Sequence, residues 1–284
     1  MVDIETYSNG HIYKIIVNKY EPIVKFNFKG KRIKTKLNFR GENIEIKQED
    51  NKIIIEKKLD IKEHIIGLGE KALNIDRRLT KVSMWNADAF QYNYGTDPLY
   101  VSIPFFISVK NGRPLGFFIN NASNVIFDFG ITQYDKIKIT VPEDGSEIYI
   151  FDDKNVEGII EKFTDITGKP FKIPKWALGH MLSRYSYFPS DKVVEVVKEY
   201  KKYVPVEAIF LDIDYMDGYR DFTWNKSFGD HKKMIKELHK ENVKVITIVD
   251  PGILIDQNYK VFKEGIGKFC NDKDGNMYIG KLWP

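Results

Sequence analysis

The stretch that decides the fold is Ile209-Phe-Leu-Asp-Ile-Asp-Tyr-Met-Asp217. Its apolar start is typical of a strand covered on both faces in a parallel sheet, and it ends in three carboxylates, Asp212, Asp214 and Asp217. Strand side chains alternate between faces, so we expect Asp212 and Asp214 to point the same way, roughly 6–7 Å apart. Two acids there carry a desolvation cost, which favours a ligand site at the carboxyl end of a strand. The alternative is a pair of solvated carboxylates that cap a neighbouring helix.

The residues around this stretch alternate between strand and helix patterns. Strands are predicted at 176–183 and 244–250, on either side of the quoted one, and Ser190 is expected to cap the first helix. The inward-facing residues predicted for three helices are Val193, Val194, Val197 and Tyr200, then Met234, Ile235 and Leu238, then Tyr259, Phe262, Ile266 and Phe269. This order, with about three βα units, predicts the first part of a parallel α/β domain over residues 169–284.

The chain before residue 169 has a different pattern, with short Ile- and Val-rich runs separated by turn residues. That many strands predict a β-sandwich over residues 1–168. The runs are 12–17, 23–28, 43–46, 52–56, 101–109, 115–119, 125–129, 137–141 and 147–151. A helix follows, with apolar residues recurring from Val156 to Ile166, and Gly168 and Pro170 end it.

The composition excludes several classes of protein. A net charge of +4 over 284 residues comes with no basic stripe, so no nucleic acid partner is expected. No apolar run approaches the roughly 20 residues that cross a bilayer, and the N-terminus lacks the pattern of a signal peptide. The single Cys270 excludes an internal disulfide framework. We therefore expect a cytoplasmic protein without membrane partners.

Other chemistries find little support in the motifs. A strand ending in Asp-x-Asp could serve phosphoryl transfer, with Asp212 as nucleophile and Asp214 as acid, but the residues that follow do not fit that site. The two acids could also hold Mg²⁺ or Ca²⁺, although an EF-hand loop is absent. The five histidines show no metal-ligand spacing, and Gly67 to Lys71 lacks the spacing of a phosphate loop, which favours a tight turn. Neither a metal nor a cofactor is expected.

Two aromatic strings give a clearer indication. Residues 84–90 and 92–100 place Trp, Tyr and Asp together between predicted strands. Sugars present apolar ring faces flanked by hydroxyl groups, so their sites combine aromatic platforms with carboxylate acceptors. Ordinary packing within a sandwich is the alternative for such a stretch.

Several collinear segments resemble glycoside hydrolase family 31, the family of α-glucosidases and α-xylosidases. The resemblance spans roughly residues 65 to 284, whereas the first 60 or so residues match only in β-character. The segments are GLGEKALNIDRR (67–78), MWNADAF (84–90), YGTDPLYVSIPFF (94–106), KPFKIPKWALGH (169–180), LSRYSY (182–187), LDIDYMDGYRDFTWN (211–225), ITIVDPGI (246–253) and the terminal GKLWP.

The resemblance implies an N-terminal β-sandwich followed by a (β/α)8 TIM barrel, and a site for a terminal glucose. It implies that Asp88 reaches into the sugar site from a sandwich loop and that Asp212 accepts hydrogen bonds from the sugar hydroxyls. Tyr187, Ile248 and Trp283 are implied to line the site. The DIDYM form is similar to the α-glucosidases, so the implied substrate is an α-linked glucoside such as maltose or a malto-oligosaccharide.

The resemblance also implies that no catalytic residue lies in these 284 residues. Family 31 enzymes retain configuration, through a nucleophile and an acid/base about 5–5.5 Å apart, and both Asp residues follow the segment at which this chain ends. We therefore expect a truncated or split enzyme, inactive alone, whose partner is the remaining C-terminal part. A non-catalytic glucan-binding or assembly half is the alternative, and homo-oligomerisation is left open.

Overall fold

The protein divides into two compact units, Met1–Pro170 and Phe171–Pro284. The structure, a computed structural model, describes residues 2–34 and 37–281. None of the helices within these residues has both the length and the apolar composition of a transmembrane span. The sequence predicts that the β-domain ends at residue 168.

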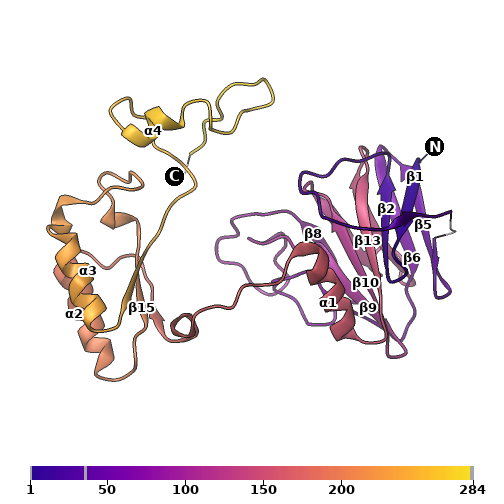
Figure 1. Ribbon diagram of the computed structural model, residues 1–284, viewed down its shortest axis with the longest axis horizontal. Helices are drawn as coiled ribbons and strands as arrows, with labels where there is room; N and C mark the ends of the chain where they lie inside the picture. The colour runs from indigo at the N-terminus through magenta and orange to yellow at the C-terminus, as the bar shows by residue number, and fades with distance from the viewer. Residues whose placement is uncertain (1, 35–36, 282–284) are drawn as a thin grey trace. The chain divides into compact units, whose positions relative to one another are not determined.

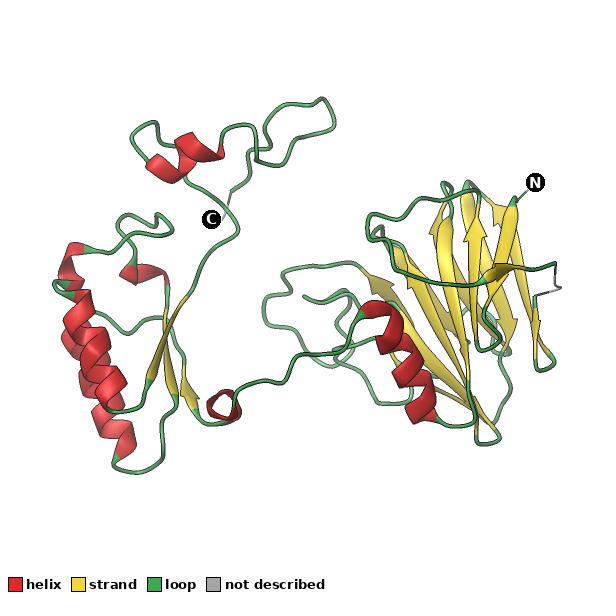
Figure 2. Ribbon diagram, in the orientation of Figure 1, coloured by secondary structure: helices red, strands yellow, loops and turns green. Residues whose placement is uncertain are grey.

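The first unit is a sandwich of two antiparallel sheets, which Figures 1 and 2 show side by side. In the described part of the chain, one sheet has seven strands in the order β3 (Lys31–Arg32), β1 (Ile4–Ser8), β2 (Ile12–Val17), β13 (Ser146–Asp152), β10 (Arg113–Asn120), β9 (Phe105–Lys110) and β7 (Glu63–Gly67). The other has six, in the order β4 (Asn38–Phe39), β5 (Glu42–Glu49), β6 (Lys52–Lys58), β12 (Lys136–Pro142), β11 (Val125–Phe129) and β8 (Lys81–Met84).

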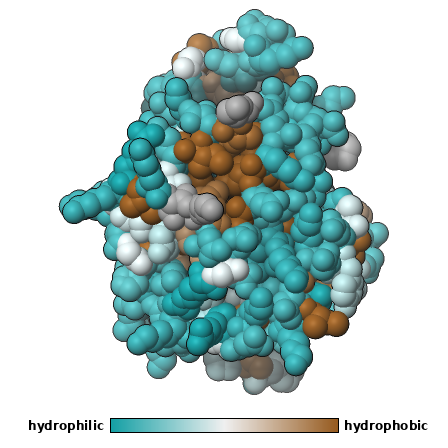
Figure 3. Space-filling model, turned by 90° about the vertical axis from the view of Figure 1, so that its right-hand side faces the viewer, coloured by the Kyte–Doolittle hydropathy of each residue, from teal (hydrophilic) through white to brown (hydrophobic). Residues whose placement is uncertain are grey.

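The core of the sandwich follows from strand alternation. In β12, Ile137, Ile139 and Val141 are buried while the residues between them are half-buried, because successive side chains point to opposite faces. These residues join one apolar cluster that draws on both sheets. The face of the unit in Figure 3 is mostly hydrophilic, with one larger hydrophobic area and several smaller ones.

Helix α1 (Val156–Thr167) ends this unit, as the sequence predicts. Asn155 caps its first turn, since the Asn155 side chain accepts a 2.8 Å hydrogen bond from the N–H of Gly158. Ile159 is buried, and the ring of Phe163 stacks on Phe105 at 4.0 Å between ring centroids. The helix therefore covers the outer face of the seven-stranded sheet.

Two of the predicted strand runs are wrong or too long. Residues 23–28 form no strand, and Ile23 is 84% exposed. Residues 101–104 are irregular, because β9 begins only at Phe105. The structure also contains strands that the sequence did not indicate, among them β7 and β8.

The second unit has a three-stranded parallel sheet among its described residues, in the order β14 (Met181–Leu182), β15 (Ala208–Leu211) and β16 (Lys244–Thr247). Helices alternate with these strands, which confirms the predicted fold class of a β-sandwich followed by parallel βα units. They are α2 (Ser190–Lys201), α3 (His231–Lys240) and α4 (Lys260–Gly265), with short 3₁₀ turns η1 (Lys175–Leu178), η2 (Ile213–Tyr215) and η3 (Lys226–Phe228).

The boundaries of these elements differ from the prediction. Residues 175–178 form a 3₁₀ turn and only Met181–Leu182 are extended, so the strand predicted at 176–183 is mostly wrong. Ser190 is the first residue of α2 rather than its cap, and no side chain caps that helix. Strand β16 ends at Thr247, three residues before Asp250. The last helix stops at Gly265, which leaves Ile266 exposed.

Candidate functional site

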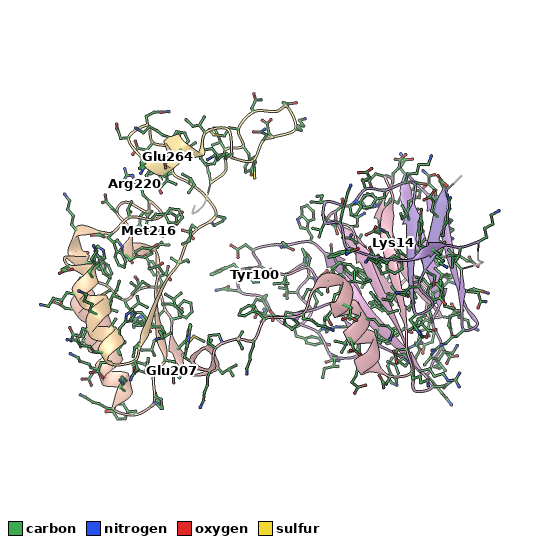
Figure 4. The ribbon with its side chains drawn as sticks, viewed as in Figure 1. Lys14, Tyr100, Glu207, Met216, Arg220 and Glu264 are labelled. Atoms are coloured by element: carbon green, nitrogen blue, oxygen red, sulfur yellow. The ribbon has the colours of Figure 1, made fainter. Side chains whose placement is uncertain are left out.

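The carboxyl end of the parallel sheet gathers most of the predicted site residues. Tyr187 follows β14, Asp212 follows β15 and Ile248 follows β16. Because the three strands are parallel and in register, these residues lie at the same edge. In Figure 4, Met216 and Arg220 mark this end of β15, and Glu207 marks the opposite end.

Asp212 and Asp214 do not stand on one strand face, which corrects the expectation from strand alternation. Strand β15 ends at Leu211, and the chain turns at once into η2, which contains Asp214. Asp212 caps this turn, since its carboxylate accepts a 2.7 Å hydrogen bond from the N–H of Ile213. Both acids are half-buried. Each carboxylate therefore keeps part of its surface available to a ligand.

Tyr185, in the loop after β14, is affected by the charges of these two acids. The negative charge of Asp214 raises the pKa of Tyr185, and Asp212 contributes in the same direction. Tyr185 is 66% exposed, so most of this residue is accessible to a ligand. Phenol hydroxyls and carboxylates are both groups that form hydrogen bonds with sugar hydroxyls. Tyr185 is part of the string LSRYSY, but only Tyr187, two residues later, was predicted as a site residue.

Tyr187 lies mainly in the apolar core of the second unit. It is 5% exposed, and the Arg184 guanidinium lies over its ring at 5.6 Å from the centroid. Burial raises the pKa of Tyr187. Its ring therefore packs mainly in the core and exposes little surface to a ligand.

Ile248 is half-buried against the same core cluster. Its N–H donates to the carbonyl of Leu211 at 3.0 Å, and its carbonyl accepts a 2.8 Å hydrogen bond from the Tyr215 hydroxyl. The segment after β16 is thus tied to the residues on either side of Asp212. Trp283, the remaining residue predicted for this end of the sheet, lies outside the described residues.

A buried acid, Asp221, was missed by the sequence analysis. It is 2% exposed, and its Oδ1 accepts a 3.1 Å hydrogen bond from the N–H of Asp250. Its own carbonyl accepts a hydrogen bond from the Tyr259 hydroxyl. Burial raises the pKa of Asp221, and the charge of Asp250 adds to that rise. Asp221 follows no strand, so strand-end reasoning had no signal for it.

Asp88 belongs to the first unit, in the irregular segment 85–104 between β8 and β9. We call this segment the aromatic loop. Asp88 is exposed, and burial together with the Asp88 carboxylate raises the pKa of the neighbouring Tyr100. The exposed fractions of the large rings in the loop are 50% for Trp85, 85% for Phe90, 55% for Tyr92, 70% for Tyr94 and 47% for Tyr100.

This loop has the composition of a sugar platform, because exposed rings and a carboxylate alternate along it. In the described parts of both units, no group of three or more His, Cys, Asp or Glu side chains could hold a metal ion.

Comparison with known proteins identifies both units. The family model of the glycosyl hydrolase 31 N-terminal galactose mutarotase-like domain matches residues 3–128. The model of the glycosyl hydrolases family 31 TIM-barrel domain matches residues 170–284.

Whole proteins with these domains match as well. An alpha-glucosidase of Saccharolobus solfataricus is 50% identical over all of this chain and 41% of its own length. Alpha-glucosidase 2 of Bacillus thermoamyloliquefaciens is 38% identical over 80% of this chain and 30% of its own length. The chain thus spans less than half the length of these relatives.

The fold has counterparts among solved structures. A GH31 dextranase of Flavobacterium johnsoniae, complexed with isomaltotriose, superimposes with a TM-score of 0.80 and 26% identity, covering 97% of this chain and 39% of the dextranase. The matches agree with the resemblance first noted in the motifs. The chain belongs to glycoside hydrolase family 31, and it carries the N-terminal β-domain and the beginning of the TIM-barrel domain of that family.

Proposed function

We propose that the chain supplies part of the glucose-binding site of a retaining α-glucosidase. The observation that carries this proposal is the 50% identity with an alpha-glucosidase over the whole chain. The proposed substrate is a terminal α-linked glucose of maltose or a malto-oligosaccharide. The DIDYM string supports glucose over xylose, since it is the form that the resemblance associates with α-glucosidases.

In this proposal Asp212 accepts hydrogen bonds from the hydroxyls of the bound glucose. Support comes from its position directly after β15 and from its half-buried carboxylate, because a partly desolvated carboxylate makes strong charge-assisted hydrogen bonds. Ile248 would pack on the sugar ring, and Trp283 would form part of the wall. Tyr187 would line the site from its core side, and Asp88 would add a second carboxylate.

The bond-breaking step is not assigned to these residues. A retaining mechanism needs a carboxylate nucleophile and a carboxylic acid about 5–5.5 Å apart across the scissile bond. Asp212 is engaged with the N–H of Ile213, and Asp250 lies beside the buried Asp221. We propose binding roles for this chain and leave both catalytic roles to other residues of the enzyme.

The second candidate function is a non-catalytic glucan-binding or assembly module, which the exposed rings of the aromatic loop favour. Assays of the purified chain separate the two. Hydrolysis of p-nitrophenyl α-glucoside by the chain alone would contradict our assignment of the catalytic roles. Saturable maltose binding without hydrolysis, unaffected by changes at Asp212, would favour the module.

The proposal is tested most directly with Asp212→Ala. Losing a hydrogen bond to a charged group costs about 1.5–3 kcal/mol, so affinity for the glucose analogue 1-deoxynojirimycin should fall about 10- to 100-fold. Titration calorimetry on the chain measures this. Asp217→Ala is the matched control, because Asp217 is an exposed acid in the same loop. Equal affinity in wild type and Asp212→Ala would disprove the assignment.

A further inference from the structure

The turn Gly67–Lys71, whose sequence resembles a phosphate loop without its spacing, fastens the aromatic loop at its base. Long segments without secondary structure are uncommon in compact domains unless they serve a function. The aromatic loop is such a segment, and it presents Asp88. The position of Asp88 therefore depends on how the ends and the middle of the loop are held.

The two glycines of the turn hold the C-terminal end of the loop. Gly67 has φ 129°, and a Cβ there would lie 2.6 Å from the carbonyl oxygen of Phe105. Gly69 has φ 66°, and a Cβ there would lie 2.8 Å from Cδ1 of Ile103. Between them, Leu68 donates its N–H to the same Phe105 carbonyl at 2.8 Å. Only glycine allows this close approach without strain.

Lys71 holds the middle of the loop. Its side chain is fully buried, and its Nζ lies 2.8 Å from Oδ1 of Asp97 and 2.8 Å from the carbonyl oxygen of Ser83. The second oxygen of Asp97 accepts a 2.6 Å hydrogen bond from the Ser83 N–H. One ion pair thus joins the turn, the end of β8 and the loop. The N–H of Gly95 adds a 2.7 Å bond to the carbonyl of Ala72, next to Lys71.

Two further hydrogen bonds connect this anchor with Asp88. Two residues after Asp97, the carbonyl of Leu99 accepts from the N–H of Ala87 at 3.0 Å. The hydroxyl of Tyr100 then donates to the carbonyl of Ala89 at 2.9 Å. Ala87 and Ala89 are therefore both hydrogen-bonded to the part of the aromatic loop just after Asp97, the residue that pairs with Lys71. Asp88 lies between Ala87 and Ala89.

We propose that Lys71 is a positioning residue for sugar binding, acting through Asp97 on the loop that presents Asp88. This inference rests on the proposed function for the identity of the ligand. Replacing Lys71 by an apolar residue leaves the Asp97 carboxylate without its cation and releases the loop, while the two sheets of the sandwich remain intact.

The test is hydrogen exchange on the full chain, followed by mass spectrometry. In Lys71→Met, the amides of Ala87 and Gly95 should exchange about tenfold faster or more, because their bonds depend on the anchored loop. Lys57→Met is the matched control: Lys57 is equally buried and pairs with Glu63 at 2.7 Å, at the other end of β7. It should lower the melting temperature but leave exchange in the loop unchanged.

A second variant separates positioning from stability. Lys71→Met with Asp97→Leu removes both buried charges, so its melting temperature should recover toward wild type while the loop still exchanges fast. Should Lys71→Met not fold, Asp97→Asn makes the same test. Protection of the loop equal to wild type in these variants, or equal loss of protection in Lys57→Met, would overturn the proposal.

Sugar binding supplies the functional readout. Affinity for 1-deoxynojirimycin should fall at least about fivefold in Lys71→Met and stay unchanged in Lys57→Met. If the wild-type chain binds no sugar, the proposed function fails, whereas the exchange measurement still decides whether Lys71 positions the loop. Unchanged affinity in Lys71→Met despite a released loop would overturn the positioning role.

Discussion

The two units of the chain bury their apolar side chains in different ways. In the sandwich, Phe106 contacts rings of both sheets, stacked on Phe117 at 4.8 Å and edge-on to Phe129 at 5.1 Å between centroids. In the barrel portion, Ile209 and Leu211 are buried in the core that α2 and α3 cover, but Phe210 between them is only half-buried. The sandwich core is thus two-sided, and the described core of the barrel portion lies on one face of its sheet.

The buried acids differ in the same sense. In the sandwich, Glu63 pairs with Lys57 at 2.7 Å and Glu147 pairs with Lys14. In the barrel portion, the buried Asp221 accepts a hydrogen bond from the N–H of another acid, Asp250, whose charge adds to the rise in the pKa of Asp221. Matched charges serve stability, whereas an acid held near a like charge is more often found at a functional site. The buried acids Glu63 and Glu147 of the sandwich are thus each paired with a lysine, whereas the buried Asp221 of the barrel portion lies beside another acid.

The largest effect should come from the two-sided core. Phe106→Ala removes a fully buried ring and should lower the free energy of unfolding of the sandwich by about 3–5 kcal/mol. Phe210→Ala, at a half-buried position, should cost less than half as much in its own unit. Urea unfolding followed by hydrogen exchange in each unit measures both. Equal losses would contradict the contrast between the two cores.

Strand alternation explains which parts of the fold could be predicted. β12 was predicted because its buried residues alternate with less buried ones over the full strand. Residues 23–28 have a similar apolar pattern but no partner strand, so Ile23 stays exposed. Pairing is a tertiary property, and a local pattern does not contain it.

The candidate site also contains residues that local sequence could predict and residues that it could not. Asp212 could be predicted, because the apolar run before it places it at a strand end. The burial of Asp221 could not, because it depends on Asp250 and Tyr259, which approach it from a segment about 30 to 40 residues later. The role of Lys71 was hidden likewise, since its partner Asp97 is distant in the sequence.

An intermediate effect on stability is expected for Asp221→Asn, which replaces the buried acid that has another acid beside it. Burial and the Asp250 charge raise the pKa of Asp221, so the folded state holds this proton more strongly than the unfolded chain. The contribution to stability is therefore present below the unfolded pKa, near pH 4, and is lost as pH rises through the higher folded pKa. Asparagine keeps an oxygen for the Asp250 N–H but carries no charge. Asp221→Asn should flatten this part of the stability profile and stabilise the barrel portion at pH 7.

Thermal unfolding between pH 4 and 8 measures the change. Asp256→Asn is the matched control, because backbone N–H donation from Asn258 and the Arg220 guanidinium lower the pKa of Asp256. That variant should lose stability at pH 7. If Asp221→Asn also lost stability at pH 7, the expected difference between Asp221, whose pKa is raised, and Asp256, whose pKa is lowered, would be wrong.

The smallest effect should come from Tyr215→Phe, which tests a side-chain hydrogen bond at the strand ends of the barrel portion. The change keeps the buried ring and removes the hydroxyl that donates to the Ile248 carbonyl at 2.8 Å. One neutral hydrogen bond contributes about 0.5–1.5 kcal/mol, so the unfolding free energy should fall by that amount. The segment after β16 also loses a tie to the loop after Asp212, so affinity for 1-deoxynojirimycin should fall by no more than about tenfold. Tyr203→Phe, at an 83% exposed position, should change neither quantity. Wild-type stability and affinity in Tyr215→Phe would mean that the Tyr215 hydroxyl contributes nothing. Backbone hydrogen bonds such as that from the Ile248 N–H to the Leu211 carbonyl would then hold the strand ends alone.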